Sequence, residues 1–441
     1  MRVNAHSASA AEKETNKIMV ADLLSRKGDR DSRMPRGHRF GFATFTALVA
    51  YASGLVFFSA LLSCSSAQGR GPKRIMENGM EVVVNGVDPY AMKGEPRALL
   101  LREEFRVDTE DDEILTAGLA DVATIDVDSE GHIYAFRRGG NSGHLIFRFD
   151  DRGRFQKSFV PIGQGPGEVL YPKFMRITAE GEIPVVNRSA RRVDFFDLDG
   201  RFLRKLALPE DIYLLPIRGI ERLANGNYLV LHFSVGPNLE VLGIVLTMTD
   251  SAFHTVKDLY EAPFSGEQIE TPFIDYPLFA ASNRAIFVSS YKPGSDIAIY
   301  DLDGVPVRGI RLDYPTPKIT PGFREAFFSQ FHPPKSPQLK SLKFPEYFPH
   351  VQAMFTDDAG RLFISSFGKD TGSGANICDV FTPGGVRILR TSLGFQDVTR
   401  LADSEMFDVV IKNGRAYSIG EKGEGFKEII VYALTWSGPG A

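Results

Sequence analysis

A repeated strand pattern fills the chain from about residue 123 to residue 434. Each copy has an apolar strand that ends in a polar turn, a second apolar strand, and a third strand that ends in an Asp-x-x-Gly-like hairpin. Four-stranded units with a period of roughly 45 to 60 residues are typical of propeller blades. The pattern therefore predicts an all-β fold, a six-bladed β-propeller of four-stranded antiparallel blades. The copies begin at Ala123, Phe174, Ile217, Leu278, His350 and Met406.

Glycine and proline recur at equivalent positions in most copies. In five copies a glycine stands where the first hairpin needs a positive φ, at Gly131, Gly181, Gly226, Gly360 and Gly414. The fourth copy has Asn283 and Arg284 there, and asparagine is the commonest substitute in the left-handed region. A proline precedes the first strand of copies two to five, at Pro172, Pro216, Pro277 and Pro349. Because a missing N–H is tolerated at a sheet edge, we expect this first strand to be innermost, beside a central channel.

The sixth copy lacks a fourth strand of its own. Met80–Val84 or Leu99–Val107, both rich in apolar residues, could supply it from the N-terminal side. Joining the two ends of the chain in one blade would close the ring and remove the open sheet edges. We therefore assign residues 80–441 to the propeller, with an excursion at 314–348.

The N-terminal part has the pattern of a lipoprotein signal peptide, at 34–63. Three arginines precede an uncharged apolar run at 40–62, and Leu61-Leu62-Ser63-Cys64 follows, which resembles a bacterial lipobox. Cleavage before Cys64 would make this residue the lipid-modified N-terminus. Residues 1–33 are expected to be disordered or to lie upstream of the true start, for which Met34 is the candidate, and 64–79 is expected to be a flexible linker.

An uncleaved membrane anchor is the competing interpretation, because about 20 apolar residues can span a bilayer. Both interpretations keep the protein at a membrane. The first predicts an exported protein that is lipid-anchored to the cell envelope. Because Ser65 rather than aspartate follows Cys64, it also predicts the outer membrane if the host is Gram-negative.

Charge and cysteine content limit the partners. A hydrophobic fraction of 43% and a charged fraction of 24% are typical of an ordered globular protein. The net charge is −4 and no basic stripe interleaved with aromatic residues occurs, so we expect no nucleic-acid partner. Of the two cysteines, lipidation of Cys64 would leave Cys378 alone, although a disulfide between them is the alternative.

The segment Tyr314 to Phe348 interrupts the repeat and is rich in proline, so it is not expected to form a strand. Thr320-Pro321 is a helix start and Pro333-Pro334 a stop, which predicts a short helix at Pro321–Phe331. Phe323, Phe327 and Phe331 would share one face of it. Either these rings pack on the propeller's own face and cover the channel mouth, or the segment forms part of a ligand or partner surface.

One motif supports a family resemblance. Gly163-Gln-Gly-Pro-Gly-Glu168 follows the first Asp-x-x-Gly hairpin, and Tyr171-Pro172 then enters the next blade. This arrangement resembles the six-bladed β-propeller lipoproteins of Bacteroidetes and related bacteria, which are similar to NHL and TolB-type propellers. The resemblance covers about residues 99–434 and implies fold and location more than chemistry. This chain departs from the family at Arg137 and Asn187, where an aspartate often stands.

Recognisable catalytic or metal motifs are missing. The histidines are scattered, and neither HExxH nor GxSxG occurs. The GQGPGE segment has no Lys-Ser/Thr after it, so a blade-to-blade turn is favoured over a phosphate cradle. The aspartates near the inner hairpins could bind calcium but are more simply explained as turn caps. These are Asp126, Asp128, Asp357 and Asp358.

Two arginines on predicted inner strands are the remaining site candidates. Arg176 and Arg218 either face the channel or form salt bridges between blades. We expect no cofactor and no metal, and a monomer that binds a protein, peptide or glycan ligand at a membrane surface. The alternative is a metal-dependent propeller enzyme of lactonase or amidating-lyase type. A ring of Glu, Asn, Asp or His side chains in the channel would favour that enzyme.

Overall fold

The computed structural model describes most of the chain from Gly71 onward. The described ranges are 71–137, 142–170, 172–209, 219–236, 238, 240–264, 271–273, 275–292, 294–329, 342–395, 409–422 and 426–438. Within these ranges no helix has both the length and the apolar character needed to cross a membrane. The expected signal peptide and Cys64 lie outside them, so both stay predictions.

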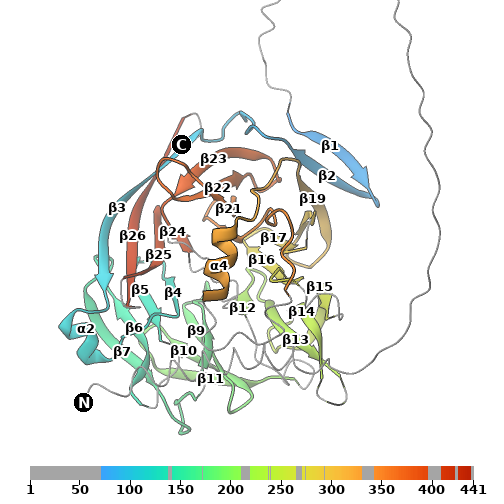
Figure 1. The fold of residues 1–441 in the computed structure, drawn as a ribbon. Coiled ribbons are helices and arrows are strands. Elements are labelled where there is room, and N and C mark those ends of the chain that lie inside the picture. The colour runs from blue at the N-terminus through green and yellow to red at the C-terminus, as the bar shows by residue number, and fades with distance from the viewer. Residues whose placement is uncertain are drawn as a thin grey trace, which may run out of the picture.

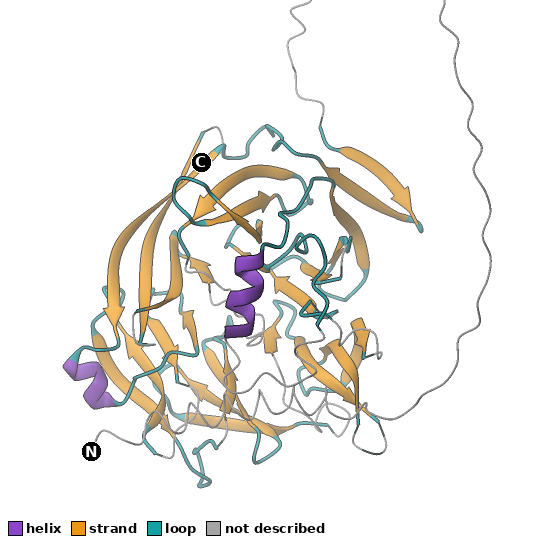
Figure 2. Cartoon of the chain, in the orientation of Figure 1, coloured by secondary structure: helices purple, strands orange, loops and turns teal. Residues whose placement is uncertain are grey.

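The described strands form six sheets arranged in a ring, which confirms the six-bladed β-propeller (Figure 1). Strands dominate, and the two described helices are α2 (Asp112–Ala117) and α4 (Pro321–Ser329) (Figure 2). From the inner to the outer strand, blade one is β4 (Thr124–Val127), β5 (Ile133–Phe136), β6 (His144–Phe149) and β7 (Phe155–Pro161). Blade two is β8 (Pro172–Met175), β9 (Glu182–Asn187), β10 (Arg192–Asp197) and β11 (Phe202–Ala207). Blade three is β12 (Gly219–Arg222), β13 (Tyr228–Val235), β14 (Val241–Thr249) and β15 (Thr255–Pro263).

The second half of the ring repeats the same order. Blade four is β16 (Pro277–Ala281), β17 (Ile286–Ser290), β18 (Ile297–Tyr300) and β19 (Pro306–Leu312). Blade five is β20 (Ala353–Thr356), β21 (Leu362–Lys369), β22 (Asn376–Phe381) and β23 (Arg387–Leu393). Blade six is β24 (Val409–Lys412), β25 (Arg415–Glu421), β26 (Lys427–Ser437) and β3 (Ala98–Asp108).

An aspartate at the end of the third strand explains why Asp-x-x-Gly recurs. The Asp150 carboxylate accepts hydrogen bonds from the backbone N–H groups of Arg152 and Arg154 and so holds the outer hairpin of blade one. Asp197, Asp250 and Asp301 cap the outer hairpins of blades two to four in the same way. Side chains that bond the local backbone favour such turns, so the sequence signal has a direct physical cause.

The inner hairpins follow the prediction in five blades and not in the fourth. All five predicted glycines have a positive φ. Asn283 does not adopt the left-handed conformation, so that expectation is wrong. The Ser282 hydroxyl instead accepts hydrogen bonds from the backbone N–H groups of Arg284 and Ala285, and this cap holds the tight turn without a positive φ.

Seven hydrophobic clusters occur among the described residues, and six of them lie between two neighbouring blades. For example, Phe136 of blade one and Val185 of blade two belong to one cluster. Apolar side chains on both faces of every blade therefore become buried only when the ring is complete. Burial of this kind is the main favourable contribution to folding.

β3 closes the ring. It pairs antiparallel with β26 from Ser437↔Ala98 to Glu428↔Asp108. Of the two N-terminal segments proposed to complete blade six, Leu99–Val107 is therefore the one that does so. This pairing covers an edge that β26 would otherwise leave open.

The other N-terminal strands extend blade four. β2 (Met80–Asn85) lies parallel to β19, and β1 (Lys73–Glu77) pairs with β2. β1 lies within 64–79, so the prediction of a flexible linker is wrong for Lys73–Glu77. Asn78 and Gly79 both have positive φ, as the tight turn of a two-residue hairpin requires. The Asn-Gly pair was thus an available hairpin signal.

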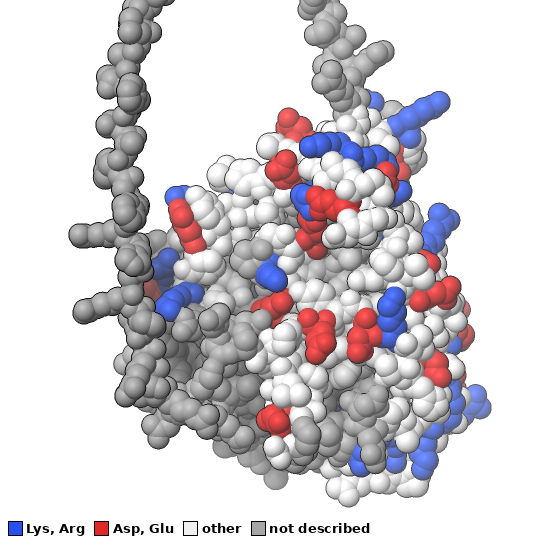
Figure 3. All heavy atoms as spheres, turned by 90° about the vertical axis from the view of Figure 1, so that its right-hand side faces the viewer, with Lys and Arg blue, Asp and Glu red and all other residues white. Residues whose placement is uncertain are grey.

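Ion pairs accompany this extension of blade four. Figure 3 shows the corresponding side of the molecule, on which acidic and basic side chains are mixed rather than separated. Arg311 of β19 bonds both Glu77 of β1 and Asp296, each at 2.6 Å. Surface pairs of this kind contribute little individually. The described residues on this face form no continuous basic field of the sort that nucleic acids select.

The segment between β2 and β3 crosses blade five. Asn85, fully buried, accepts a hydrogen bond from the Arg387 backbone N–H at 2.8 Å. The Arg387 guanidinium donates to the Gly86 carbonyl and is paired with the buried Asp379. The N-terminal segment therefore contacts blades four, five and six in succession.

The GQGPGE segment is a blade-to-blade turn, as predicted. It lies between β7 and β8, and an isolated bridge joins Ile162 and Val169 at its base. The Glu168 carboxylate folds back and accepts a hydrogen bond from the Gly165 N–H at 2.8 Å. A side chain at Gly163 would collide with this carboxylate, so the glycine accommodates an internal contact.

Candidate ligand-binding site

The inner strands surround a cavity of about 470 Å³. Small-molecule sites usually measure roughly 300–1,000 Å³. All six blades contribute to the lining, which includes Ala179 and Ala224 at the exposed tips of two inner hairpins. The cavity therefore opens on the hairpin side of the ring.

Four charged side chains line one part of the cavity. They are Asp126 in β4, Arg176 just after β8, Glu221 in β12 and Lys412 at the end of β24. Each residue lies at or near the C-terminal end of an inner strand, and the four come from blades one, two, three and six. Two carboxylates thus share this part of the channel with two cations.

Asp126 and Arg176 are fixed by bonds that cross from blade one to blade two. The Asp126 carboxylate accepts from the backbone N–H of Ile177 at 2.7 Å and from that of Val127 at 2.8 Å. The Arg176 guanidinium donates to the Ile125 carbonyl at 3.0 Å. Arg176 therefore both lines the cavity and links blades, which combines the two interpretations from the sequence.

Glu221 differs from these neighbours. Its nearest charged partner is Arg176, whose Nε lies 3.7 Å from the carboxylate, beyond hydrogen-bonding distance. Burial raises the pKa of Glu221 to about 7, because attraction to Arg176 and Lys412 does not offset desolvation and the repulsion from Asp126. A perturbed carboxyl group in a cleft is a marker of functional sites.

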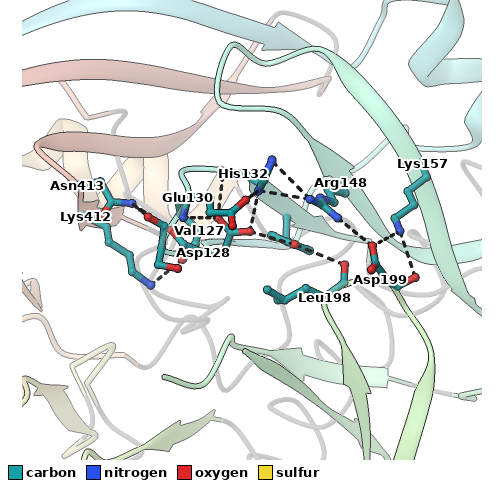
Figure 4. A network of polar contacts seen from close by, with 12 residues as sticks. Val127, Asp128, Glu130, His132, Arg148, Lys157, Leu198, Asp199, Lys412 and Asn413 are labelled. Carbon is teal, nitrogen blue, oxygen red and sulfur yellow. Dashed lines mark hydrogen bonds and ion pairs between the residues drawn. The ribbon is translucent and has the colours of Figure 1, made fainter. Parts of the chain in front are cut away.

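Lys412 connects the cavity to a polar network on the hairpin side (Figure 4). Its ammonium donates to the Val127 carbonyl at 2.7 Å, and the neighbouring Asn413 side chain donates to the Asp128 carbonyl at 3.1 Å. These bonds join blade six to blade one beside the charged part of the cavity.

The network continues from Asp128 across blade one. The Asp128 carboxylate contacts His132 Nδ1 at 2.9 Å (Figure 4). It also accepts a hydrogen bond from the Tyr134 hydroxyl at 3.2 Å. Burial opposes ionisation of Asp128, but hydrogen bonds from His132 hold its pKa below the usual value. Arg148 lies beside His132 and pairs with Asp199 of blade two. The network holds blades one, two and six in register.

The opposite part of the cavity is apolar. Leu278 and Ala281 of blade four and Met354 of blade five line it, and Tyr276 and Tyr291 lie at the end away from the hairpins. The two tyrosine rings stack with centroids 6.4 Å apart. The cavity therefore has a charged part and an apolar, partly aromatic part.

An aromatic cluster lies behind these tyrosines and includes helix α4. Phe323 of α4 contacts Phe273, Phe344 and Phe348, and Phe273 contacts Tyr291. α4 therefore packs over the end of the channel opposite the hairpins, where it appears in front of the ring in Figure 1.

The helix prediction agrees with the structure over the described part. α4 spans Pro321–Ser329, and Phe331 lies outside the described residues. Phe327 is only 4% exposed and contacts Phe344, while Phe323 is half-buried. Packing on the protein's own surface thus accounts for Phe327, and the structure gives that ring no exposed face for a partner.

Among the other residues singled out from the sequence, Asp357 and Asp358 line the cavity, whereas Asp128 and Cys378 do not belong to its lining. Arg218 lies outside the described residues. Cys378 is buried in blade five, and burial raises the pKa of its thiol. Asp128 and Asp357 accept backbone N–H bonds from their hairpins, which agrees with turn capping. In the part of the chain that the structure describes, no three His, Cys, Asp or Glu side chains come together to hold a metal ion.

Sequence inspection missed Glu221 and Lys412. A usable signal was present, because both are charged residues near the ends of short inner strands, Gly219–Arg222 and Val409–Lys412. What the sequence lacked was the ring geometry that brings blades three and six within reach of blade one.

Comparisons with known proteins assign the chain to no family. No family model and no curated protein sequence matches the chain. A protein from Bacteroides fragilis described as exported shares 13% identity, with a TM-score of 0.45, and the match covers 81% of this chain and all of the other. A virginiamycin B lyase from Staphylococcus aureus shares 12% identity, with a TM-score of 0.39 and coverage of 77% and 100%.

A gluconolactonase from Xanthomonas campestris gives the same values as the lyase: 12% identity, a TM-score of 0.39, and coverage of 77% and 100%. At such low identities and TM-scores these similarities provide no evidence of a common activity. The function of this propeller has to be inferred from the residues of its own channel.

Proposed function

We propose that this protein is a ligand-binding propeller that takes up a small molecule, or a segment of a peptide or glycan, in its central channel. One observation carries the proposal: a preformed cavity of about 470 Å³ combines charged side chains from four blades with an apolar, aromatic part. Binding sites typically join an apolar lining to a few convergent polar groups that orient the ligand.

The rigidity of the lining supports this proposal. Asp126 and Arg176 are held by backbone groups of neighbouring blades, and Lys412 is held by the Val127 carbonyl. A ligand that enters such a site would lose little binding energy to ordering the protein. The charged groups are therefore preorganised for recognition.

The alternative, a metal-dependent enzyme, finds less support in the channel. Asp126 and Glu221 share it with Arg176 and Lys412, so a divalent cation would meet positive charge close to its would-be ligands. Metal sites need several deprotonated ligands around one ion. Metal analysis of the purified protein tests this alternative, which predicts a stoichiometric ion that is lost on substitution of Glu221.

The proposal also places the protein at the cell envelope, anchored through Cys64. Its support is the lipobox-like Leu61-Leu62-Ser63-Cys64 after an uncharged apolar run. The described chain starts soon afterwards with β1 at the outer edge of blade four. An anchored protein would thus be tethered at one side of the ring.

A fragment library screened by ligand-observed NMR tests the binding function. Ala224→Trp would place a large ring at the cavity opening, at the exposed tip of an inner hairpin. Ala359→Trp is the matched control, because Ala359 is exposed on the inner hairpin of blade five but does not line the cavity.

Hits that bind the wild type and the Ala359→Trp variant, but not Ala224→Trp, would support channel binding. The proposal would be overturned if the wild type gave no hits, or if Ala224→Trp left all of them unchanged. Far-ultraviolet circular dichroism of the three proteins checks that each is folded.

A further inference from the structure

We propose that the channel selects a ligand with a positively charged nitrogen on an apolar body, and that the Glu221 carboxylate binds this nitrogen. The inference rests on the channel-binding function proposed above and names the ligand class for that site. Amines and guanidines attached to an aromatic or aliphatic group belong to this class.

The first support is the hydrogen bonding of the four charged residues. Asp126 accepts two backbone N–H groups, Arg176 donates to the Ile125 carbonyl, and Lys412 donates to the Val127 carbonyl. Across the described residues, Glu221 has no hydrogen bond to its carboxylate, only the 3.7 Å approach of Arg176. Its oxygens are therefore the acceptors left for a ligand.

The second support is the charge balance of the lining. Two charged lining residues are neutralised by residues outside it: Arg222 pairs with Glu180 at 3.1 Å, and Asp357 pairs with Arg361 at 3.2 Å. The other charged lining residues are three carboxylates, Asp126, Glu221 and Asp358, and two cations, Arg176 and Lys412. With all of them ionised, this set has an excess of negative charge, which favours a cationic ligand over an anionic one.

The third support is the apolar part of the cavity. Tyr276, Tyr291 and Met354 line it, and the tyrosines stack on each other. Aromatic faces attract organic cations as well as apolar groups, so this surface suits the body that carries the charged nitrogen. Glu221 and these rings are parts of one cavity, which allows a single ligand to contact both.

Binding of a cation at Glu221 should be linked to the release of a proton. Because the pKa of Glu221 is raised to about 7, part of its population is protonated near neutral pH. A bound cation favours the ionised carboxylate and so releases a proton, whereas a bound anion would favour the protonated form and take one up. Asp126, Arg176 and Lys412 are the other charged groups that act on this carboxyl group.

Three probes with one body and different head groups test the ligand class. Phenylbutylamine is cationic, phenylbutanol neutral and phenylbutyrate anionic. Calorimetry in buffers of different ionisation enthalpy would measure affinity and proton release for the wild type, Glu221→Gln and Glu103→Gln. Glu103 of β3 is the matched glutamate, since it pairs with Arg106 and neither residue lines the cavity.

We expect the amine to bind most tightly, with proton release, and its affinity to rise about tenfold from about pH 6 to about pH 8 as Glu221 ionises. Glu221→Gln should weaken the amine at least about tenfold and abolish the release, while Glu103→Gln should change neither. Proton release by the wild type tests the inference even if Glu221→Gln does not fold.

Equal or tighter binding of the alcohol or the butyrate would overturn the inference, as would an amine affinity independent of Glu221. The inference would also be overturned if none of the three probes bound while fragments from the library did bind in the channel. In each of these cases channel binding itself stands, because Ala224→Trp tests it separately.

Discussion

Gly200 in the outer hairpin of blade two lies beneath the ring of Phe159 in blade one, so that a Cβ atom on Gly200 would be 2.5 Å from that ring. The same relation recurs around the ring, where Gly153 of blade one lies beneath Phe105 of β3. The glycine of the Asp-x-x-Gly hairpin therefore serves two purposes. It adopts a positive φ, and it leaves room for a side chain of the preceding blade.

The Gly200→Ala substitution should destabilise the protein by about 2–4 kcal/mol, because left-handed strain and a steric clash add. Gly181→Ala is the matched control. Gly181 also has a positive φ, but its Cβ would lie 3.5 Å from Leu198, an ordinary contact. We expect Gly181→Ala to lower the free energy of unfolding by about 1–2 kcal/mol, from backbone strain alone. Denaturant unfolding measures both free energies. If Gly200→Ala and Gly181→Ala lowered the free energy of unfolding equally, the clash with Phe159 would not explain the glycine.

Glu221 should make stability depend on pH. Its folded-state pKa of about 7 lies above the usual value of 4.5, so the folded state keeps the proton over a range in which the unfolded state releases it. The free energy of unfolding should therefore fall as pH rises between these values, by about 2–3 kcal/mol in total, and then level off.

Denaturant unfolding of wild type and Glu221→Gln across this range checks the expectation. The difference between the two proteins should be smallest near the acidic end, and the variant should be the more stable protein at higher pH. Glu180→Gln should follow the wild type, because Glu180 lies near the surface and its pKa is lowered. A pH-independent difference between wild type and Glu221→Gln would argue against a raised pKa.

Removal of β3 should open the ring. A chain that starts after Val107 leaves β26 with an unpaired edge and exposes the apolar faces of blade six, so it should aggregate or unfold. A chain that starts at Met80 loses only β1 and should remain a folded monomer with a modestly lower melting temperature. Size-exclusion chromatography and thermal unfolding of the two truncations make the comparison. A stable monomer without β3 would disprove this closure.

Phe327 should contribute to stability as a core residue. Phe327→Ala removes a ring that is 4% exposed and should cost about 3–5 kcal/mol. Phe328→Ala on the same helix is the control. Because Phe328 is only partly buried, this substitution should lower the free energy of unfolding clearly less than Phe327→Ala. If Phe327→Ala left the melting temperature unchanged, helix α4 would not be an integral part of the fold.

Cys64→Ala tests the proposed anchor. In a bacterial host, metabolic labelling with a fatty acid should mark the wild type and not the variant, which should accumulate as an uncleaved precursor. Cys378→Ala is the control, since Cys378 is buried in blade five. Normal labelling of the Cys64 variant would refute lipid attachment at this residue.

The sequence by itself determined the fold and the number of blades, because strand period, capping aspartates and hairpin glycines are local properties of the chain. It also determined the start of helix α4 from Thr320-Pro321. The tertiary structure decided that β3, and not β2, completes blade six, since both segments have suitable strand composition.

The candidate site was decided almost entirely by the tertiary structure. Arg176 could be proposed from its strand, but its neighbours Glu221 and Lys412 come from distant parts of the chain. The raised pKa of Glu221 depends on burial and on charges from other blades. Burial and charge proximity exist only when the ring has closed, so no local pattern could reveal them.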